Sequence, residues 1–263
     1  MEKITFYKYQ GTGNDFVMID NRAQTFPKTD VSLINKLCDR KFGIGADGLI
    51  LLENDDATDF KMVYYNADGN ESTMCGNGGR CIVAFAYDLE IIKNQTSFIA
   101  VDGLHHATIN KDDIVALQMI DVVKDTITLG EKNEFLFTGS PHHVEIVENI
   151  SAYDVFNNGK NIRYSTIYSP GGTNVNFVEK VEENHFKIRT YERGVEDETL
   201  SCGTGATAVA IAMYHTNKAN DKTIAIDVEG GKLAISFEED NEKYFDVKLI
   251  GPAKQVFKGE LIL

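Results

Sequence analysis

The sequence has little positive charge, few prolines and no long hydrophobic run. Its 263 residues include 26 lysines and arginines against 40 acidic residues, so the formal net charge is −14 at pH 7. Binding to nucleic-acid phosphates needs clustered basic side chains, and we therefore expect no nucleic-acid partner. No apolar run approaches the roughly 20 residues of a membrane-spanning helix, so we expect no membrane partner. Residues 1–6 lack the apolar segment of a signal peptide, which predicts a cytoplasmic protein.

The scarcity of proline also affects how domains can be recognised. The chain has only four prolines, and no segment rich in proline, glycine or serine separates its two halves. Its length suits either one large domain or two medium ones. A domain boundary must therefore be sought in a repeated pattern.

Cysteine is also scarce, with four residues and no C-x-x-C pair. This spacing argues against zinc, so we expect no metal. A disulfide framework is not expected in a cytosolic protein. Cys38 lies in a helical apolar pattern and Cys81 follows a helix start by about one and a half turns, so packing roles are predicted for both. Cys75 and Cys202 are the candidates for catalysis.

These two cysteines begin matching segments, Cys-Gly-x-Gly followed by an apolar helix, with a tyrosine twelve positions after each cysteine. The start of a helix has unpaired backbone N–H groups and the positive end of the helix dipole. Glycines allow an anion to approach this backbone closely. A thiol at the same place is expected to be reactive. Two such sites in one chain are a strong signal.

Hydrophobic periodicity predicts the remaining elements. Residues 42–48 alternate glycine as a dinucleotide-binding loop does, but they precede a strand and open no helix, so that function is rejected. Helices are expected at residues 32–41 and 152–160. Strands are expected at residues 4–9, 17–20, 49–52, 60–65, 97–109, 114–119, 135–138, 143–147 and 186–191, with three more ending in 255–263.

Both halves of the chain show strands, a Gly/Asn turn and then the cysteine helix, and residues 11–17 echo residues 172–178. We therefore predict an α+β fold of two pseudo-symmetric lobes, each a curved, mostly antiparallel, barrel-like sheet around a central helix, with the active site in the cleft between them. The lobes are predicted at residues 1–118 and 119–252. A final strand at about 253–263 is expected to return to the first lobe.

Such an arrangement would place the two thiols on opposite sides of one bound molecule. A thiolate can then remove a proton from one face of a carbon while a thiol supplies one to the other face. This is stereoinversion, and it requires no cofactor. Hydride transfer would need a dinucleotide site, and acyl transfer would need a nucleophile beside a base.

The assembled motifs closely resemble those of the diaminopimelate epimerase family. The matching segments are GTGNDF (11–16), FGIGADG (42–48), NADG (66–69), MCGNGGRC (74–81), PHH (141–143), GTNVNFV (172–178) and ERGVEDETLSCGTGA (192–206). The resemblance implies a cofactor-independent homodimer that interconverts LL- and meso-diaminopimelate in lysine and peptidoglycan precursor synthesis. It implies that Cys75 and Cys202 are the catalytic bases. The substrate-binding residues that it implies are Asn14, Asn66, Gly76, Asn77, Asn174, Glu192, Arg193, Gly203 and Thr204.

The resemblance leaves some positions open. His142, in a predicted loop, is a possible supporting residue that steers a substrate group or a thiol proton. Ser140 replaces the asparagine that the family has before Pro-His, and Gly48 stands where some members have a glutamine. The alternative enzyme is a two-thiol racemase of the proline or hydroxyproline type, for which Glu192 and Arg193 would have no purpose. A non-catalytic alternative is an amino acid binding protein or a thiol redox sensor.

Overall fold

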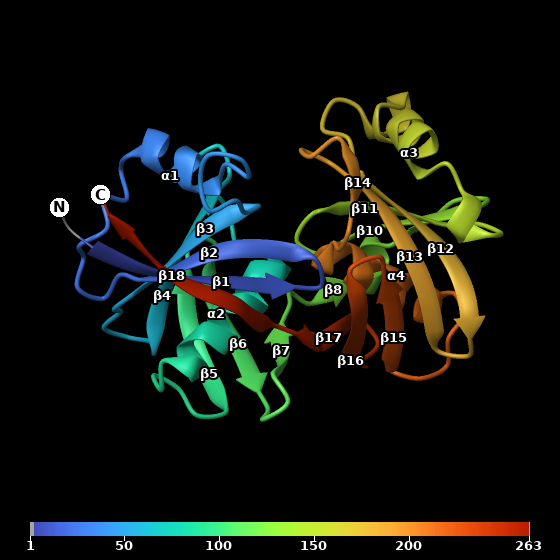
Figure 1. Cartoon of the computed structure of the whole chain (residues 1–263). Coiled ribbons are helices and arrows are strands. Elements are labelled where there is room, and N and C mark those ends of the chain that lie inside the picture. The colour runs from blue at the N-terminus through green and yellow to red at the C-terminus, as the bar shows by residue number, and fades with distance from the viewer. Residues whose placement is uncertain (1–2, 263) are drawn as a thin grey trace. The chain divides into compact units, whose positions relative to one another are not determined.

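The computed structural model describes residues 3–262, which form two compact units of mixed α and β structure (Figure 1). The first unit extends to Leu117 and includes the C-terminal segment from Gly251, and the second comprises Gln118–Ile250. Each unit contains a curved sheet of mostly antiparallel strands and one long buried helix. The fold is thus α+β, as the sequence predicts.

The first unit follows the order strand, strand, helix, strand, strand, helix and three strands. Its elements are β1 (Lys3–Gly11), β2 (Asn14–Asp20), α1 (Val31–Cys38), β3 (Gly48–Glu53), β4 (Phe60–Asn66), α2 (Gly76–Asp88), β5 (Gln95–Ala100), β6 (Gly103–Ile109) and β7 (Ile114–Gln118), with β18 (Lys254–Ile262) added from the C-terminus. The strand order in the sheet is β18-β1-β2-β3-β4-β5-β6-β7.

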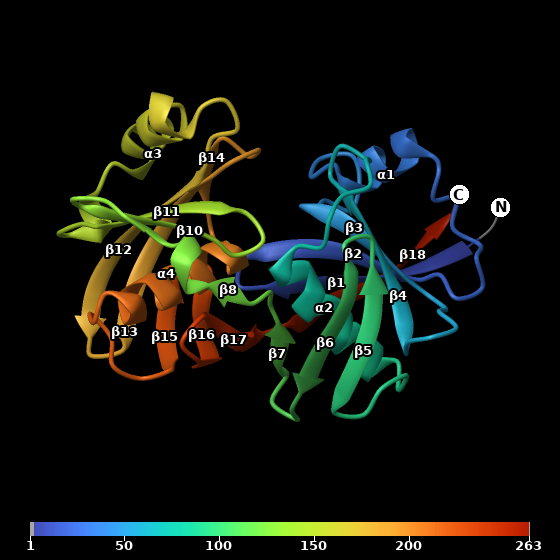
Figure 2. The ribbon, with the colours of Figure 1, turned by 180° about the vertical axis from the view of Figure 1, so that it is seen from behind.

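Helices cover both faces of the sheet in the first unit. All six residues of β3 are buried, because α1 contacts the strand from one side and α2 from the other. One cluster packs Ile34 and Leu37 of α1 against Val17, Leu49 and neighbouring side chains. Helix α2 is buried all round from Gly76 to Ala86 and lies across the strands in Figure 2. A helix without a polar face is typical of a core element.

The second unit repeats the same order of elements. It contains β8 (Val122–Val123), η1 (Lys124–Thr126), β9 (Thr128–Leu129), β10 (Asn133–Phe137), β11 (Pro141–Ile146), η2 (Ile150–Ala152), α3 (Val155–Arg163), η3 (Thr166–Tyr168), β12 (Asn174–Glu182), β13 (His185–Glu192), β14 (Asp197–Thr199), α4 (Gly203–His215), β15 (Thr223–Val228), β16 (Gly231–Glu239) and β17 (Lys243–Pro252). Helix α4 packs against Phe186 and Ile188 on one face of the sheet, while Val155 next to α3's N-cap packs against Phe177 and Tyr191 on the other.

The pairing directions of the strands demonstrate the repeat. From β1 to β7 the successive pairs are antiparallel, parallel, antiparallel, parallel, antiparallel and antiparallel. The pairs from β10 through β11, β12, β13, β15 and β16 follow the same series, and β16 pairs antiparallel with β17. Helix α2 therefore corresponds to α4, and α1 corresponds to α3.

This topology corrects one expectation from the sequence. Residues 11–17 lead into β2, whose counterpart in the second unit is β11, whereas residues 172–178 lead into β12, the counterpart of β3. The echo between the two segments is therefore not the structural repeat. Both segments consist of a glycine-containing turn followed by the start of a strand. The similar residues therefore reflect a similar local conformation and not equivalent positions in the two units.

Several predicted boundaries also change. The single strand expected at residues 97–109 is a hairpin, β5 and β6, which reverses at Val101 and Asp102. Four strands follow α4 where three were predicted, and α3 begins at Val155, after a 3-10 turn. Pro141 and His142 lie in β11 and not in a loop. Alternation of apolar residues continues through these tight reversals, so the pattern alone does not locate them.

Candidate functional site

Cys75 and Cys202 occupy the N-cap positions of the two equivalent helices, α2 and α4. Both have extended backbone angles, with φ −93° and ψ 133° at Cys75 and φ −121° and ψ 109° at Cys202. Neither side chain makes the capping hydrogen bond that a serine or aspartate makes at this position. The first-turn N–H groups at both helix starts can therefore face an anion.

The other two cysteines differ from this pair, as the sequence predicts. Cys38 packs in the core of the first unit, and burial raises the pKa of its thiol to about 11. Cys81 is completely buried in α2, and burial raises the pKa of its thiol to about 12. Both thiols are protonated at neutral pH, which suits packing and not acid–base chemistry.

The predicted substrate residues of the first unit lie together at one end of the neighbouring strands β2, β3 and β4. Asn14 is the first residue of β2, and Asn66 is the last residue of the antiparallel strand β4, paired with Gly48 at the start of β3. The side chain of Asn77 donates from Nδ2 to Oδ1 of Asn14, which brings the first turn of α2 to these strand ends. The residues at positions 14, 66, 75, 76 and 77 are thus gathered by strand ends and one helix start.

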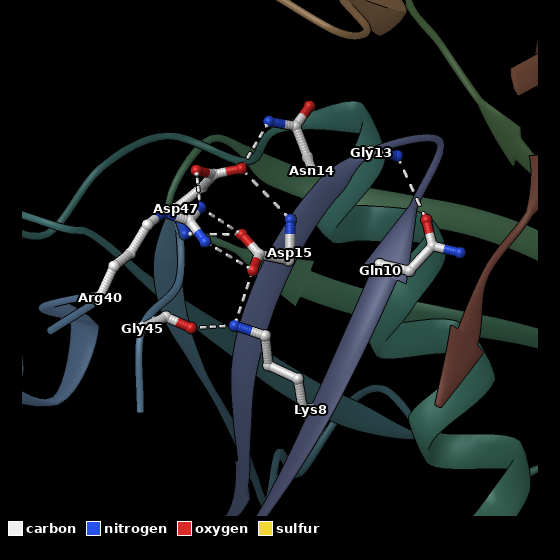
Figure 3. A network of polar contacts seen from close by, with 8 residues as sticks. All are labelled: Lys8, Gln10, Gly13, Asn14, Asp15, Arg40, Gly45 and Asp47. Atoms are coloured by element: carbon white, nitrogen blue, oxygen red, sulfur yellow. Dashed lines mark hydrogen bonds and ion pairs between the residues drawn. The ribbon is translucent and has the colours of Figure 1, made fainter. Parts of the chain in front are cut away.

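A network of charges holds Asn14 (Figure 3). Asp47 accepts from Asn14 Nδ2 at 3.0 Å and from Arg40 Nη2 at 2.7 Å. Arg40 also binds both carboxylate oxygens of Asp15, at 3.0 and 2.7 Å, and buried Lys8 pairs with Asp15 at 2.7 Å. Burial raises the pKa of Asp15, but the hydrogen bonds and charges of Arg40 and Lys8 outweigh it and hold that pKa at about 2. Asp15 is therefore ionised at neutral pH.

The network determines which way the carboxamides of Asn14 and Asn77 face. A carboxylate can only accept hydrogen bonds, so Asn14 must turn its Nδ2 toward Asp47. The Oδ1 of Asn14 then faces Asn77. Because this oxygen can only accept, Asn77 donates to it from Nδ2. Asp47 thereby sets the orientation of a side chain two residues after Cys75.

Arg80, in the second turn of α2, is a second buried charge near this helix start. Its side chain is fully buried and donates from Nη2 to Thr12 Oγ1 at 2.9 Å. Within residues 3–262, Nε and Nη1 of Arg80 have no hydrogen-bond partner. Burial lowers the pKa of Arg80, and attraction to the sulfurs of Cys81 and Cys75 acts against that effect. A cation here favours a negative charge at the start of α2.

The second unit gathers its predicted residues at the corresponding strand ends. Asn174 begins β12, paired in register with His142, and Glu192 ends β13. The Oδ1 of Asn174 accepts from the backbone N–H of Arg193 at 2.8 Å, and Glu192 accepts from Thr199 at 2.9 Å. The exposed guanidinium of Arg193 extends to the carbonyl of Gly171 at 3.5 Å. The first turn of α4 adds Gly203 and Thr204 to the same strand ends.

His142 is completely buried in β11, so its predicted loop position is wrong. Its Nε2 lies 2.9 Å from Ser140 Oγ, and its Nδ1 lies 3.1 Å from Asn176 Nδ2. Burial, followed by the positive charge of Arg193, lowers the pKa of His142 to about 3. This imidazole is neutral at physiological pH and acts as a hydrogen-bonding group.

Gly48, the other departure from the family pattern, is explained by its neighbours. A Cβ at this position would lie 2.6 Å from the ring of Tyr64 and 2.5 Å from the carbonyl oxygen of Tyr65. The aromatic ring occupies the space into which a longer side chain at position 48 would extend. A glutamine could not be accommodated here without displacing the β4 backbone.

Sequence reasoning missed the supporting residues Lys8, Arg40, Asp47, Arg80 and Asn176. Asp47 and Arg80 lie inside the quoted motifs FGIGADG and MCGNGGRC, which was the available signal. Across residues 3–262 no three His, Cys, Asp or Glu side chains gather as a metal site would require. None of the helices in that range combines the length and apolar character needed to cross a membrane.

Solved structures share the fold. A Bacillus anthracis phenazine biosynthesis protein of the PhzF family matches over 100% of both chains, with a TM-score of 0.76 and 15% identity. A hydroxyproline epimerase from Agrobacterium vitis, with bound trans-4-hydroxy-L-proline, matches 99% of this chain and 93% of its own, with a TM-score of 0.71 and 13% identity. At such identities the likeness concerns the fold alone.

Sequence comparisons are more specific. A family model described as diaminopimelate epimerase matches residues 6–124 and 135–256. The diaminopimelate epimerase of Flavobacterium psychrophilum is 64% identical over 96% of this chain and 98% of its own. That of Chlorobaculum tepidum is 42% identical over 96% of this chain and 99% of its own. The Aquifex aeolicus protein of the same name is 41% identical over 97% of each chain. Two helix-start cysteines in repeated units and these matches together lead to one conclusion: the chain belongs to the diaminopimelate epimerase family.

Proposed function

We propose that this protein interconverts LL- and meso-diaminopimelate without a cofactor, using Cys75 and Cys202 as its two acid–base groups. The observation that carries the proposal is the equivalence of the two cysteines. Each is the N-cap of the buried helix in one of two units with the same strand pairing. Each unit also presents asparagine or glutamate side chains at the adjoining strand ends.

In the proposed reaction, the substrate lies between the two cysteines with its reacting carboxylate on the N–H groups at the helix starts. One cysteine, as a thiolate, removes the hydrogen from the α-carbon and becomes a thiol. The other, as a thiol, donates a proton to the opposite face and becomes a thiolate. The helix-start N–H groups stabilise the negative charge that develops on the carboxylate between these steps. Product release leaves the enzyme with the two protonation states exchanged.

The far end of diaminopimelate carries a second ammonium and a second carboxylate. Adjacent Glu192 and Arg193, one acidic and one basic, suit one of each. Asn14 and Asn66 in the first unit and Asn174 in the second supply neutral hydrogen-bonding groups at strand ends. A proline-type substrate lacks this second head group, and Glu192 with Arg193 therefore favours diaminopimelate.

The proposal is tested by hydrogen exchange in deuterated water with reduced protein and LL-diaminopimelate. Deuterium should enter the inverted product, while recovered substrate stays largely unlabelled at early times. Cys75→Ala and Cys202→Ala should each lower kcat at least about a hundredfold, because each removes one acid–base group. Cys38→Ala is the matched control, since that thiol packs in the apolar core of the first unit and belongs to neither helix start, and it should retain activity.

Two outcomes would contradict the proposal. Full activity in either helix-start variant would exclude the two-cysteine mechanism. Racemisation of proline with no exchange into diaminopimelate would identify the alternative enzyme.

The proposal extends to assembly and location. We infer a homodimer from the family resemblance, and light scattering of the purified chain measures it directly. The chemistry requires reduced thiols, which the cytoplasm maintains. Fractionation of the native host, with the protein found outside the cytoplasmic fraction, would contradict the inferred location.

A further inference from the structure

A continuous series of hydrogen bonds leads from the core of the second unit to the sulfur of Cys202. It passes through Asn176, His142, Ser140 and Thr204. Most hydroxyl and imidazole hydrogen bonds can run in either direction. Here backbone groups at two points determine the direction of each step as far as Thr204.

The first of these points is Asn176. Its Nδ2 donates to the carbonyl oxygen of His143 at 2.8 Å, and a carbonyl can only accept. The same nitrogen lies 3.1 Å from Nδ1 of His142, so Nδ1 must accept the second amide hydrogen. Neutral imidazole then carries its one proton on Nε2, which donates to Ser140 Oγ at 2.9 Å. The buried position of His142, whose pKa is lowered to about 3 by burial and by the charge of Arg193, keeps this ring neutral.

The second point is Asn174. Its Oδ1 accepts from the backbone N–H of Arg193, which can only donate, so its Nδ2 faces the other way. That nitrogen donates to the carbonyl of Pro141 at 3.0 Å and to Ser140 Oγ at 3.1 Å. Ser140 Oγ therefore receives two hydrogen bonds, one from His142 and one from Asn174.

Both lone pairs of the Ser140 hydroxyl are thus occupied, and its own hydrogen can only be donated onward. Thr204 Oγ1 lies 3.3 Å away and accepts it. Thr204 can then direct its hydrogen to Cys202 Sγ, at 3.5 Å. The series thus ends at the sulfur, with the Thr204 hydrogen available for donation to it.

We propose that Ser140 is a positioning residue that directs the Thr204 hydroxyl onto Cys202 and thereby stabilises the thiolate form of Cys202. A hydrogen bond donated to the ionised form of an acid favours that form. The start of α4 favours the same charge through its dipole. Resting on the proposed function, this stabilises Cys202 in the state in which it acts as the base.

The inference also gives Ser140 a purpose specific to this chain. Ser140 immediately precedes β11, and Asn14 begins β2, the counterpart of β11 in the other unit. In the first unit the corresponding pair is two carboxamides, Asn14 and Asn77. In the second unit it is two hydroxyls, and a hydroxyl can accept and donate through one small atom.

The test is the rate at which a small alkylating reagent, iodoacetamide, modifies each cysteine of the full-length reduced protein across pH. Mass spectrometry of the peptides reports Cys202 and Cys75 separately in one sample, so Cys75 is an internal reference. Ser140→Ala should raise the midpoint pH of Cys202 alkylation by about one pH unit, the size expected for one hydrogen bond to a charged group. Cys75 should keep its wild-type midpoint.

Two further variants distinguish the effect of the hydrogen bond that Ser140 donates from a general effect of packing around Thr204. Ser140→Thr retains the hydroxyl and should leave the Cys202 midpoint near its wild-type value. Thr138→Val removes a part-buried hydrogen bond, 2.8 Å long, to the carbonyl of Thr204 without changing any side chain of the hydrogen-bond series. It should also leave the Cys202 midpoint unchanged. An unchanged midpoint in Ser140→Ala would overturn the proposal, as would an equal shift in Thr138→Val.

This outcome is independent of whether the substrate is diaminopimelate. A shifted Cys202 midpoint in a protein that exchanges no hydrogen into diaminopimelate would refute the proposed function and leave the role of Ser140 standing. Normal epimerase activity together with an unshifted Cys202 midpoint in Ser140→Ala would support the proposed function and refute the role of Ser140.

Discussion

Residues that can hydrogen-bond in only one direction orient the side chains around both cysteines. Asp47 is such a group in the first unit, because a carboxylate accepts and never donates. In the second unit the carbonyls of His143 and Pro141 and the N–H of Arg193 have this effect. The identity of an asparagine in the sequence does not reveal which of its ends faces a substrate. Its fixed neighbours decide that.

The role of Asp47 can be tested with Asp47→Asn. The introduced amide should keep its oxygen at Arg40, since a hydrogen bond from a charged group is the stronger one, and turn its nitrogen toward Asn14. The carboxamides of Asn14 and Asn77 would then reverse. We expect kcat/KM for diaminopimelate to fall about tenfold, the equivalent of one hydrogen bond.

Removing Arg40 provides the control for that prediction. With Arg40→Met added to Asp47→Asn, the amide can turn its oxygen back to Asn14, and part of the lost kcat/KM should return. Arg40→Met alone should cost less activity than Asp47→Asn, because Asp47 still accepts from Asn14. A double variant less active than either single one would show that the ion pair matters only for rigidity.

At the scale of the element, the two cysteine helices are the cores of their units. Helix α2 is buried from Gly76 to Ala86, and α4 is buried at nearly every position from Gly203 to Met213. Their small residues permit this, because strands and side chains approach the helix backbone closely. The neighbouring atoms are held more rigidly at some of these glycines than at others.

Gly205→Ala should destabilise the protein although alanine favours helix formation. A Cβ there would lie 2.4 Å from Oδ1 of Asn176, whose carboxamide is held by Thr190 and His143. We expect a loss of about 1–3 kcal/mol in the free energy of unfolding, typical of an overpacked core, measured by urea denaturation.

Gly79→Ala in α2 is the matched comparison. Its Cβ would meet only the ends of Leu117 and Met74, which can move aside, so the stability should change little. Equal destabilisation of the two variants would mean that Asn176 is not rigidly held.

At the scale of the whole molecule, the chain consists of two units with one topology and different side chains at equivalent places. Asn77 corresponds to Thr204, and the buried Arg80 corresponds to Thr207, whose hydroxyl donates to Gly203 within α4. The two units share their backbone topology, but they differ in the charged side chains at equivalent positions. Such a difference is what two equivalent thiols need if one is to be ionised while the other is protonated.

The proposed function requires the two thiols to meet on one substrate carbon, and oxidation tests this. Diamide, which takes up two electrons and two protons, should join Cys75 and Cys202 in an intramolecular disulfide and abolish activity. Dithiothreitol should restore it, and peptide mapping should locate the bond. Retained activity with both thiols still reduced would mean that they do not approach each other.

Much of the fold could be predicted from the sequence because the signals are local. The N-cap cysteines, the buried helices and most strands follow from glycine spacing and apolar periodicity. The hairpin at β5 and β6 was missed because alternation runs through its turn, and the echo of residues 11–17 in 172–178 was misleading. Boundaries depend on hydrogen bonds between distant segments, which periodicity does not contain.

The amino-acid sequence establishes the chemistry available to this protein, since it places two thiols at two glycine-rich helix starts and contains the family's motifs in order. The orientation of those groups depends on contacts that form when the chain folds. Asp47 meets Asn14 across 33 positions of chain, and Ser140 meets Thr204 across 64. Hydrogen-bond direction depends on which donors and acceptors are neighbours in space, and folding alone brings them together.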